Sequence, residues 1–307
     1  MSTTSSPTIH LIGAPTDIGA SVRGAGMGPD ALRVADLPGT LSRHGFNVVD
    51  AGNLAGPSTP WALPSNGLRH LDEVVAWNRA VYDAVEGALN AGHVPLLMGG
   101  DHSLAVGSIS AIARRARARG QNLRVIWLDA HSDVNTDATS PSGNLHGMPV
   151  SCLLGHGPAA LSGWSGEPAA LDAEAIRFIG IRSVDTQEKL AIRTLGLRVY
   201  DMRHIDENGM RVTMTEALAD IDENTHLHVS FDLDCLDPAD APGVGTGVRG
   251  GPTYREMQLC MEMIADTGRL ASLDVVELNP ALDVRNSTAE VAVELIESLF
   301  GKSTLAR

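Results

Sequence analysis

The sequence has few cysteines and no long apolar run. Its three cysteines, Cys152, Cys235 and Cys260, are an odd number without CxxC spacing, so neither a disulfide framework nor a cysteine-bound structural zinc site is indicated. No apolar stretch is long enough to cross a membrane, and the polar N-terminal residues lack the apolar core of a signal peptide. These absences predict a cytoplasmic protein in a reducing compartment.

Positive charge is also scarce. The 307 residues include 23 Lys and Arg against 37 Asp and Glu, a formal net charge of -14. Nucleic acids and anionic membranes bind basic surfaces, so neither is expected as a partner. The glycine-rich stretch from Gly13 to Gly28 lacks the GxGxxG spacing of a dinucleotide site, and no nicotinamide cofactor is expected. This stretch fits a plain surface loop and, equally well, a loop that borders an active site.

Predicted strands and helices alternate along most of the chain. Runs rich in Val, Ile and Leu predict buried strands, and apolar residues at helical spacing predict the helices between them. The predicted strands are 8–12, 47–50, 94–98, 124–129, 176–181, 198–201, 226–232 and 270–278, and the predicted helices are 30–43, 68–91, 103–119, 148–154, 187–195, 210–222, 253–265 and 288–300. This alternation predicts a three-layer α/β/α fold with a mostly parallel central sheet. We expect a single domain over residues 1–307, with residues 1–7 a flexible tail.

Metal-binding side chains stand directly after one of these strands. Asp129, His131 and Asp133 alternate in the segment DAHSD, behind an apolar run that ends at Leu128. Residues two apart in an extended backbone point to the same side, so the three side chains share one face if strand geometry persists. Such a cluster is costly unless a cation compensates its charge. The segment therefore predicts a metal site at the carboxyl end of this strand.

Two further strands end in a similar way. Asp232 and Asp234 stand at the end of a later apolar run, and His102 follows an earlier one in a GGDH turn. Each motif alone has an ordinary explanation, because Asp101 fits a helix cap and aspartates before a proline serve in turns. Ligands bind beyond the carboxyl ends of parallel strands. Three strand ends with compatible side chains therefore favour one polynuclear metal site.

The donor set indicates the kind of metal. Four carboxylates and two imidazoles, without sulfur, suit manganese or another borderline divalent ion. Six ligands exceed what one ion takes while leaving room for substrate, so two bridged ions are favoured, and such a pair can lower the pKa of a bridging water. Dinuclear phosphoesterases also use an Asp-x-His pair, but the GNH-like and GHxH-like segments that they need are absent from suitable positions.

Several segments resemble the arginases. They are GGDHSLAVGS (99–108), DAHSDVNT (129–136), SGNLHGMPVS (142–151), SFDLDCLDP (230–238) and VVELNP (275–280), in the order that the family has them. The resemblance covers nearly the whole chain, is closest to the bacterial arginases and implies an arginase-like fold. The metal motifs belong to the wider ureohydrolase superfamily, which includes agmatinases, whereas SGNLHG and the following MPVS are more specific to arginases.

The resemblance implies a manganese-dependent enzyme that hydrolyses L-arginine to L-ornithine and urea. A hydroxide that bridges two manganese ions would attack the guanidinium carbon, with Asp129 and Asp232 as bridging carboxylates. The implied ligands are His102, Asp129, Asp133 and Asp232 for one ion, and His131, Asp129, Asp232 and Asp234 for the other. The implied catalytic residues are His146, which shuttles protons, Glu277, which orients the guanidinium, and the ligand Asp133.

Recognition of the amino-acid end is implied to lie in the loop after DAHSD and in the segment RSVDTQE. The implied substrate-binding residues are Asn135, Ser140, Ser142, Asn144, Asp185, Glu188 and, close to the guanidinium, Thr246. Asn135, Ser140 and Ser142 would bind the carboxylate directly or through water, and Asp185 and Glu188 lie near the amino group. A neutral loop of hydroxyls and amides suits an anion, and acids suit a cation.

Some positions depart from the family pattern and some questions stay open. Cys235 and Gly247 stand where glycine and proline are usual, which puts turn rigidity and thiol sensitivity in question. Ser132 is expected to face away from the metals and to matter less. A ureohydrolase that acts on agmatine or another guanidino compound is the alternative enzyme, and a catalytically silent metal-stabilised protein is the alternative class. The resemblance implies a homo-oligomer, a trimer or a hexamer; its size, the metal loaded in the cell and regulation by product or pH stay open.

Overall fold

The computed structural model describes residues 7–60, 67–163 and 169–305. Within them, one sheet of eight strands has the order β2-β1-β3-β8-β7-β4-β5-β6, and each neighbouring pair is parallel. The strands are β1 (Thr8–Gly13), β2 (Asn47–Asn53), β3 (Val94–Met98), β4 (Asn122–Leu128), β5 (Ile176–Ile181), β6 (Arg198–Asp201), β7 (Thr225–Asp232) and β8 (Leu270–Val276). The tail predicted at residues 1–7 lies outside the described residues except for Pro7.

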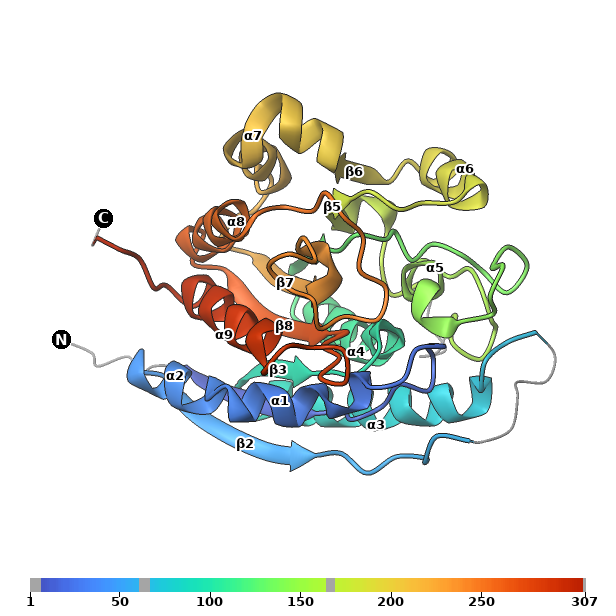
Figure 1. Ribbon diagram of the computed structural model, residues 1–307, viewed down its shortest axis with the longest axis horizontal. Coiled ribbons are helices and arrows are strands. Elements are labelled where there is room, and N and C mark those ends of the chain that lie inside the picture. The colour runs from blue at the N-terminus through green and yellow to red at the C-terminus, as the bar shows by residue number, and fades with distance from the viewer. Residues whose placement is uncertain (1–6, 61–66, 164–168, 306–307) are drawn as a thin grey trace.

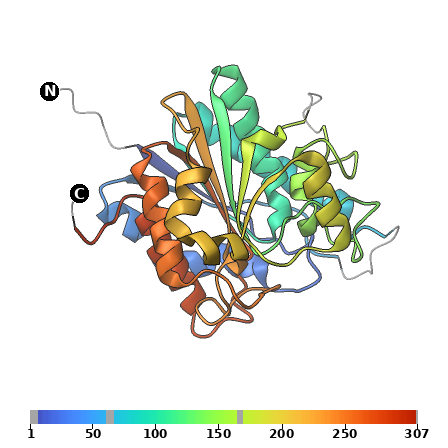
Figure 2. The same cartoon turned by 90° about the horizontal axis from the view of Figure 1, so that it is seen from above.

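Helices cover both faces of this sheet (Figures 1 and 2). They are α1 (Gly28–Val34), α2 (Leu37–Arg43), α3 (Leu71–Asn90), α4 (Ala105–Ala118), α5 (Pro149–Leu153), α6 (Thr186–Leu195), α7 (Met202–Ala217), α8 (Tyr254–Asp266) and α9 (Ser287–Leu299). On one face, α1, α2, α7, α8 and α9 pack against strand residues such as Leu11 and Val229. On the other, α3 to α6 pack against residues such as Leu97 and Trp127. The predicted three-layer α/β/α fold is confirmed, with a sheet whose described strands are all parallel.

The strand order determines where the site forms. β3, β8, β7 and β4 are consecutive neighbours at the centre of the sheet, and β7 is buried along its whole length. Parallel strands end at the same edge, so the segments that follow β3, β7 and β4 meet there. No helix within the described residues is long and apolar enough to cross a membrane.

Two predicted helices differ most from the observed ones. The helix predicted at residues 30–43 is divided into α1 and α2 at Asp36, whose φ of 62° is left-handed. Pro38 has no N–H to extend a preceding helix but is tolerated in a first turn, so the chain begins a new helix there.

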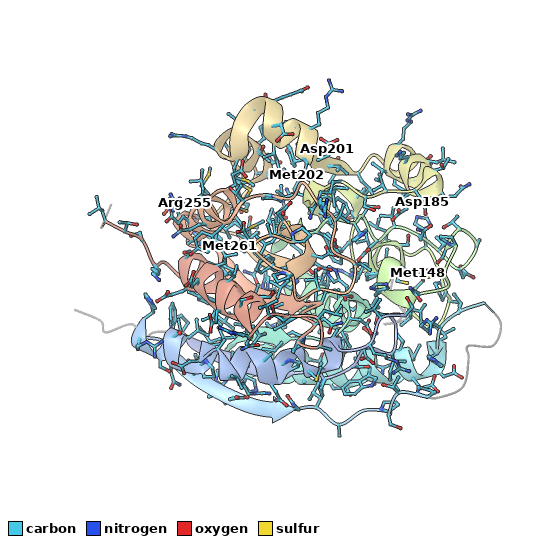
Figure 3. The ribbon with its side chains drawn as sticks, viewed as in Figure 1. Met148, Asp185, Asp201, Met202, Arg255 and Met261 are labelled. Atoms are coloured by element: carbon cyan, nitrogen blue, oxygen red, sulfur yellow. The ribbon has the colours of Figure 1, made fainter. Side chains whose placement is uncertain are left out.

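The helix predicted at residues 210–222 begins earlier and ends earlier. The α7 segment begins at Met202, because the Asp201 side chain accepts a hydrogen bond from His204 N at 2.8 Å and caps the helix (Figure 3). It is interrupted at Gly209, where φ is 80° and ψ is 154°, and it ends at Ala217. The cap and the interruption depend on local backbone geometry, which the apolar spacing does not encode.

A buried polar row lies on β7 and β8. His226 Nε2 and His228 Nδ1 lie 3.0 and 2.9 Å from the Ser272 hydroxyl oxygen. Burial, with a smaller effect of the Arg119 charge, lowers the pKa of His226 to about 4. The folded protein therefore holds His226 uncharged near neutral pH.

Replacement of His226 by glutamine is expected to reduce the loss of stability in acid. The unfolded chain takes up a proton at His226 below its ordinary pKa of 6.5, whereas the folded chain does so only near 4. This contribution to stability is therefore full above pH 6.5 and falls as the pH decreases toward 4, by at most about 1.4 kcal/mol per pH unit. Glutamine does not titrate, so urea unfolding of wild type and H226Q at several pH values between 7 and 4 should show a shallower slope for the variant. Equal slopes for the two proteins would contradict the lowered pKa of His226.

Candidate metal centre and active site

The segment after β4 carries the first three candidate ligands, but strand geometry does not persist through it. The strand ends at Leu128, and Asp133 has a left-handed φ of 53°. The expectation of one shared strand face is therefore wrong in its geometry. The side chains nevertheless converge, because the chain turns and brings Asp133 Oδ2 to 3.3 Å from His102 Nδ1. Left-handed backbone is uncommon for an aspartate, and such residues gather at functional sites.

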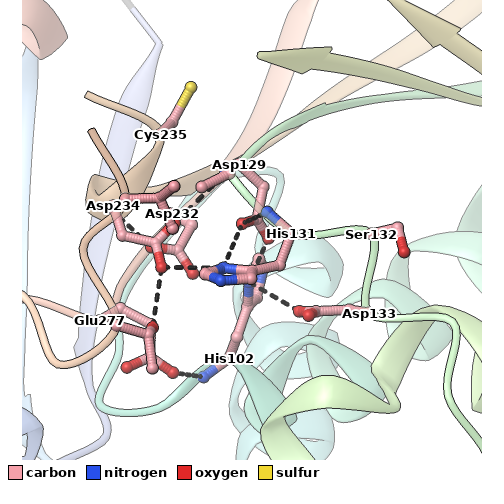
Figure 4. Close-up of polar contacts among 12 residues, drawn as sticks. His102, Asp129, His131, Ser132, Asp133, Asp232, Asp234, Cys235 and Glu277 are labelled. Atoms are coloured by element: carbon pink, nitrogen blue, oxygen red, sulfur yellow. Dashed lines mark hydrogen bonds and ion pairs between the residues drawn. The ribbon is translucent and has the colours of Figure 1, made fainter. Parts of the chain in front are cut away.

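His102 and three carboxylates form the first group of candidate ligands (Figure 4). His102 Nδ1 lies 3.2 Å from Asp129 Oδ2 and 3.1 Å from Asp232 Oδ2, in addition to its contact with Asp133. The His102 ring stacks on the Trp127 ring with centroids 4.1 Å apart, and its Nε2 lies 2.8 Å from Ser230 Oγ. Donation from Nε2 to this hydroxyl would leave the Nδ1 lone pair directed at the carboxylates, as a metal ligand requires.

His131 belongs to a second group. Its Nδ1 lies 3.1 Å from Asp234 Oδ2 and 3.6 Å from Asp129 Oδ1. The hydroxyl of Thr246 donates to the same Asp234 oxygen at 2.8 Å. Asp129 contributes one oxygen to each group, so it lies between the two imidazoles. The structure thus brings the six sequence-predicted ligands together as two groups that share a carboxylate.

The electrostatics of the cluster favour bound cations. Burial, reinforced by neighbouring carboxylates, raises the pKa of Asp133 and of Asp232 well above the usual value. Burial opposes protonation of His131, but its hydrogen bonds to Asp129 and Asp234 raise its pKa to about 12. These carboxylates need compensation by protons or by metal ions, and four carboxylates with two imidazoles are a donor set that fits borderline divalent ions. The residues present therefore fit a dinuclear metal site.

Glu277 and His146 form a buried pair beside the cluster. Glu277 Oε1 accepts a hydrogen bond from His102 N at 2.8 Å and lies 2.9 Å from His146 Nδ1. Burial opposes the charged forms, but the attraction between the two groups raises the pKa of His146 and lowers that of Glu277. Glu277 has a left-handed φ of 63°, and its N–H donates to Gly100 O at 2.8 Å. The carboxylate is thus held in one place and kept ionised.

A small cavity is lined by several of the candidate metal ligands and by His146, whereas Glu277 is not among its lining residues. Its volume is about 130 Å³. The lining residues are His131, Asp133, Asn135, His146, Gly147, Glu188, Asp232, Asp234 and Thr246. The cavity therefore joins predicted metal ligands with the predicted proton shuttle and with three of the predicted substrate-binding residues.

The other four predicted substrate-binding residues, Ser140, Ser142, Asn144 and Asp185, do not line this cavity. Ser140 Oγ accepts from Gly143 N at 3.0 Å, and Ser142 Oγ accepts from Asn144 N at 3.2 Å. Asn144 accepts from Arg69 Nε at 2.8 Å. These contacts order the loop itself, and the roles of Ser140, Ser142 and Asn144 toward a substrate carboxylate stay predictions.

Asp185 lies at the start of α6 (Figure 3) and is hydrogen-bonded to Glu188. Asp185 Oδ1 accepts from the N–H groups of Gln187 and Glu188, and Glu188 Oε2 accepts from Asp185 N at 2.9 Å. This reciprocal capping box fixes the start of the helix. Asn135 Nδ2 donates to Asp185 Oδ2 at 3.0 Å, which connects the pair to the segment after β4.

Ser132 makes a contact that the sequence motifs did not indicate. Its side chain points away from the metal-ligand cluster, as expected (Figure 4). Its hydroxyl donates to Glu188 Oε1 at 2.8 Å, and the two residues are 56 positions apart in the chain. Only the packing of α6 against this segment could have revealed the pair.

The glycine-rich stretch at residues 13–28 borders the site. His146 N donates to Gly19 O at 3.3 Å, and Gly19 N donates to Asp101 Oδ2 at 2.9 Å. Asp101 also accepts from Ser103 N, so it does cap the following turn. A Cβ at Gly100 would lie 1.7 Å from Thr16 O, so this close approach requires glycine. Of the two interpretations of the stretch, the loop that borders the candidate site is the one that these contacts support.

Cys235 and Gly247, the two departures expected from the family resemblance, lie in tight surroundings. Cys235 is fully buried, and burial raises the pKa of its thiol well above the usual value, which disfavours the reactive thiolate. A Cβ at Gly247 would lie 3.1 Å from Val244 Cγ2 and 3.3 Å from Pro238 Cγ. A larger residue there would require small shifts in its neighbours.

The fold is parallel α/β/α, with imidazoles and carboxylates gathered at one sheet edge beside a Glu–His pair, and comparison with known proteins identifies it as that of a ureohydrolase, a class of hydrolases. The model for the Arginase family matches residues 7–301. An arginase from Brevibacillus brevis is 44% identical over 298 residues, which covers 97% of this chain and 99% of that protein. The chain belongs to the arginase family.

Solved arginase structures are similar over the same length. The native structure of the arginase from Bacillus caldovelox has 42% identity and a TM-score of 0.92, covering 97% of this chain and 100% of that chain. The arginase from Entamoeba histolytica in complex with L-ornithine has 30% identity and a TM-score of 0.87, with the same coverage.

Manganese is expected to raise the melting temperature of the chelator-treated protein. Ions that bind only the folded state stabilise it, by about 2.7 kcal/mol when their concentration is 100 times Kd. D129N should abolish most of this response, because Asp129 takes part in both groups, whereas D83N on the exposed side of α3 should keep it. Thermal unfolding with and without manganese measures the response, and an equal response in D129N and wild type would refute the assignment.

Proposed function

We propose that this protein is a manganese-dependent arginase that hydrolyses L-arginine to L-ornithine and urea. The observation that carries the proposal is the pair of imidazole–carboxylate groups sharing Asp129, placed beside the buried Glu277–His146 pair and opening onto one cavity. Membership of the arginase family supports the same reaction. The proposed reaction is hydrolysis at the guanidinium carbon.

Two manganese ions per subunit are proposed. His102, Asp129, Asp133 and Asp232 would hold one ion, and His131, Asp129, Asp232 and Asp234 the other. When bound, such a pair of ions lowers the pKa of a water between them and so supplies a nucleophile near neutral pH. The buried carboxylates direct their oxygens toward the same space, and the donor set without sulfur favours manganese over thiolate-binding metals.

Glu277 is proposed to orient the guanidinium group. A guanidinium has only N–H donors, and a carboxylate only accepts, so the two can pair in a fixed geometry. The neighbouring His146 lowers the pKa of Glu277 against the effect of burial, so the carboxylate stays ionised for this contact. Thr246, through Asp234, would fix the nearby wall of the cavity.

His146 is proposed to deliver a proton to the leaving amino group of ornithine. Breaking the bond between carbon and nitrogen requires protonation of that nitrogen. The ring lines the cavity, and Glu277 raises its pKa despite burial, which keeps a proton available near neutral pH. Asp133, a neighbour in the cavity wall, is proposed to act through its role as a ligand.

The amino-acid end of the substrate would lie between Asn135 and the start of α6. Asp185 and Glu188 offer carboxylates to the α-amino group, and the neutral loop at residues 135–144 suits the carboxylate. The neighbour from Entamoeba histolytica was solved with L-ornithine, the amino-acid product of this reaction. Agmatine or another guanidino compound is the alternative substrate. Agmatine lacks the carboxylate that this loop is proposed to bind.

Purified protein loaded with manganese is expected to release urea from L-arginine much faster than from agmatine. The physical reason is the missing carboxylate, which removes the contacts proposed for Asn135 and Ser142. Urea release is measured for both substrates over a range of concentrations. Absence of urea with a folded, metal-loaded protein would refute the proposed function, and a preference for agmatine would transfer it to the alternative.

Replacement of His146 by alanine is expected to lower kcat by about 100-fold, the lower range for loss of a general acid or base. Metal content should stay unchanged, because His146 is outside the proposed ligand set. H156A, which removes an exposed histidine, is the matched control and should keep wild-type kcat. An H146A protein with full metal and full activity would exclude the proton-transfer role.

We also propose a homo-oligomer in the cytoplasm, a trimer or a hexamer, on the basis of the resemblance to bacterial arginases. A measurement of mass in solution distinguishes the two sizes.

A further inference from the structure

We propose that Ser132 is a positioning residue that holds the Glu188 carboxylate in place for the α-amino group of the substrate. The proposal rests on the proposed arginase function and adds to it a residue outside the set of metal ligands and substrate contacts. Ser132 would act only through Glu188, so it is not itself a catalytic residue.

The contact between the two side chains is buried and directional. Ser132 is fully buried, and Glu188 is 8% exposed. Ser132 Oγ donates a hydrogen bond to Glu188 Oε1 at 2.8 Å. Loss of this donor would leave a buried acceptor unsatisfied.

Glu188 reaches the cavity from a position that Ser132 helps to determine. Glu188 lines the cavity together with Asn135 and His146. Its other oxygen, Oε2, accepts from Asp185 N at 2.9 Å. One oxygen is thus fastened to the backbone of its own helix and the other to the segment after β4.

Ser132 is well placed to act as this second attachment. Its chain neighbours His131 and Asp133 are in contact with the carboxylate and imidazole cluster, so its backbone is restrained from both sides. Its hydroxyl points away from the metal-ligand cluster (Figure 4). Asn135 makes a second contact of this kind, because its Nδ2 donates to Asp185 Oδ2 at 3.0 Å. Two hydrogen bonds therefore connect the metal-ligand segment to the start of α6.

The two ends of the substrate should respond differently to loss of the hydroxyl. The guanidinium would be held by Glu277 and the reacting groups, none of which contacts Ser132 through a described hydrogen bond or ion pair. The amino group would be held by Glu188. Removal of the Ser132 hydroxyl should therefore weaken binding of substrates that carry an α-amino group and leave the chemical step nearly unchanged.

The test compares L-arginine with 5-guanidinopentanoate, which is arginine without its α-amino group. S132A is expected to raise KM for L-arginine about tenfold, equivalent to roughly 1.4 kcal/mol. It should leave kcat within about twofold and KM for 5-guanidinopentanoate unchanged, because a contact made equally in the ground state and the transition state affects KM and not kcat. S132T, which keeps the hydroxyl, should restore the low KM for L-arginine.

A double-mutant cycle and a control separate positioning from general damage. In an E188Q background, S132A should add less than about a twofold change in KM, because coupled residues are not additive. S151A removes another buried hydroxyl from the same region, one that donates to Val134 O at 2.6 Å. It should lower the melting temperature without changing the ratio of the two KM values.

Three outcomes would overturn the proposal: an unchanged KM for L-arginine in S132A, an equal rise for both compounds, or a fall in metal content that accounts for the loss. If wild type hydrolyses neither compound, the proposed function fails separately. Calorimetric binding of the same two compounds to metal-loaded wild type and S132A then decides the positioning role.

Discussion

The mutual repulsion of buried carboxylates at one edge of the sheet is the constraint on which the rest of the site depends. Asp129, Asp133, Asp232 and Asp234 are all buried, and Glu277 lies beside them. Burial of one unpaired charge costs several kcal/mol, and burial of several like charges costs more unless cations are shared among them. This negative charge is compensated by the two imidazoles, by N–H groups that donate to the carboxylates and by the proposed metal ions.

That requirement also explains why the backbone around the site is unusual. Asp133 and Glu277 adopt left-handed backbone conformations, which residues other than glycine rarely take. Each such conformation costs about 1–3 kcal/mol. The surrounding contacts make the strained positions tolerable, because Glu277 N is bonded to Gly100 O and the Glu277 carboxylate to His102 N. The left-handed backbone of these two residues directs their carboxylates toward the imidazoles.

The residues proposed to recognise the amino group are positioned by the segment that carries the candidate metal ligands, but they are not metal ligands themselves. The start of α6 carries Asp185 and Glu188, and their capping box would form in many helices. Their position relative to the reacting groups comes from the hydrogen bonds that Asn135 and Ser132 make from the segment after β4. One rigid segment thus bears candidate metal ligands on one side and supports the candidate amino-group site on the other.

The sequence by itself determined the layers of the fold and the positions of the candidate ligands, because both are local patterns. An apolar run followed by Asp or His, as at Asp129 or Asp232, is visible without any partner. The breaks at Asp36 and Gly209 and the pairing of Ser132 with Glu188 were decided only by the tertiary structure. They depend on backbone angles and on residues distant in the chain, which come together only when parallel strands end at a common edge and helices pack against them.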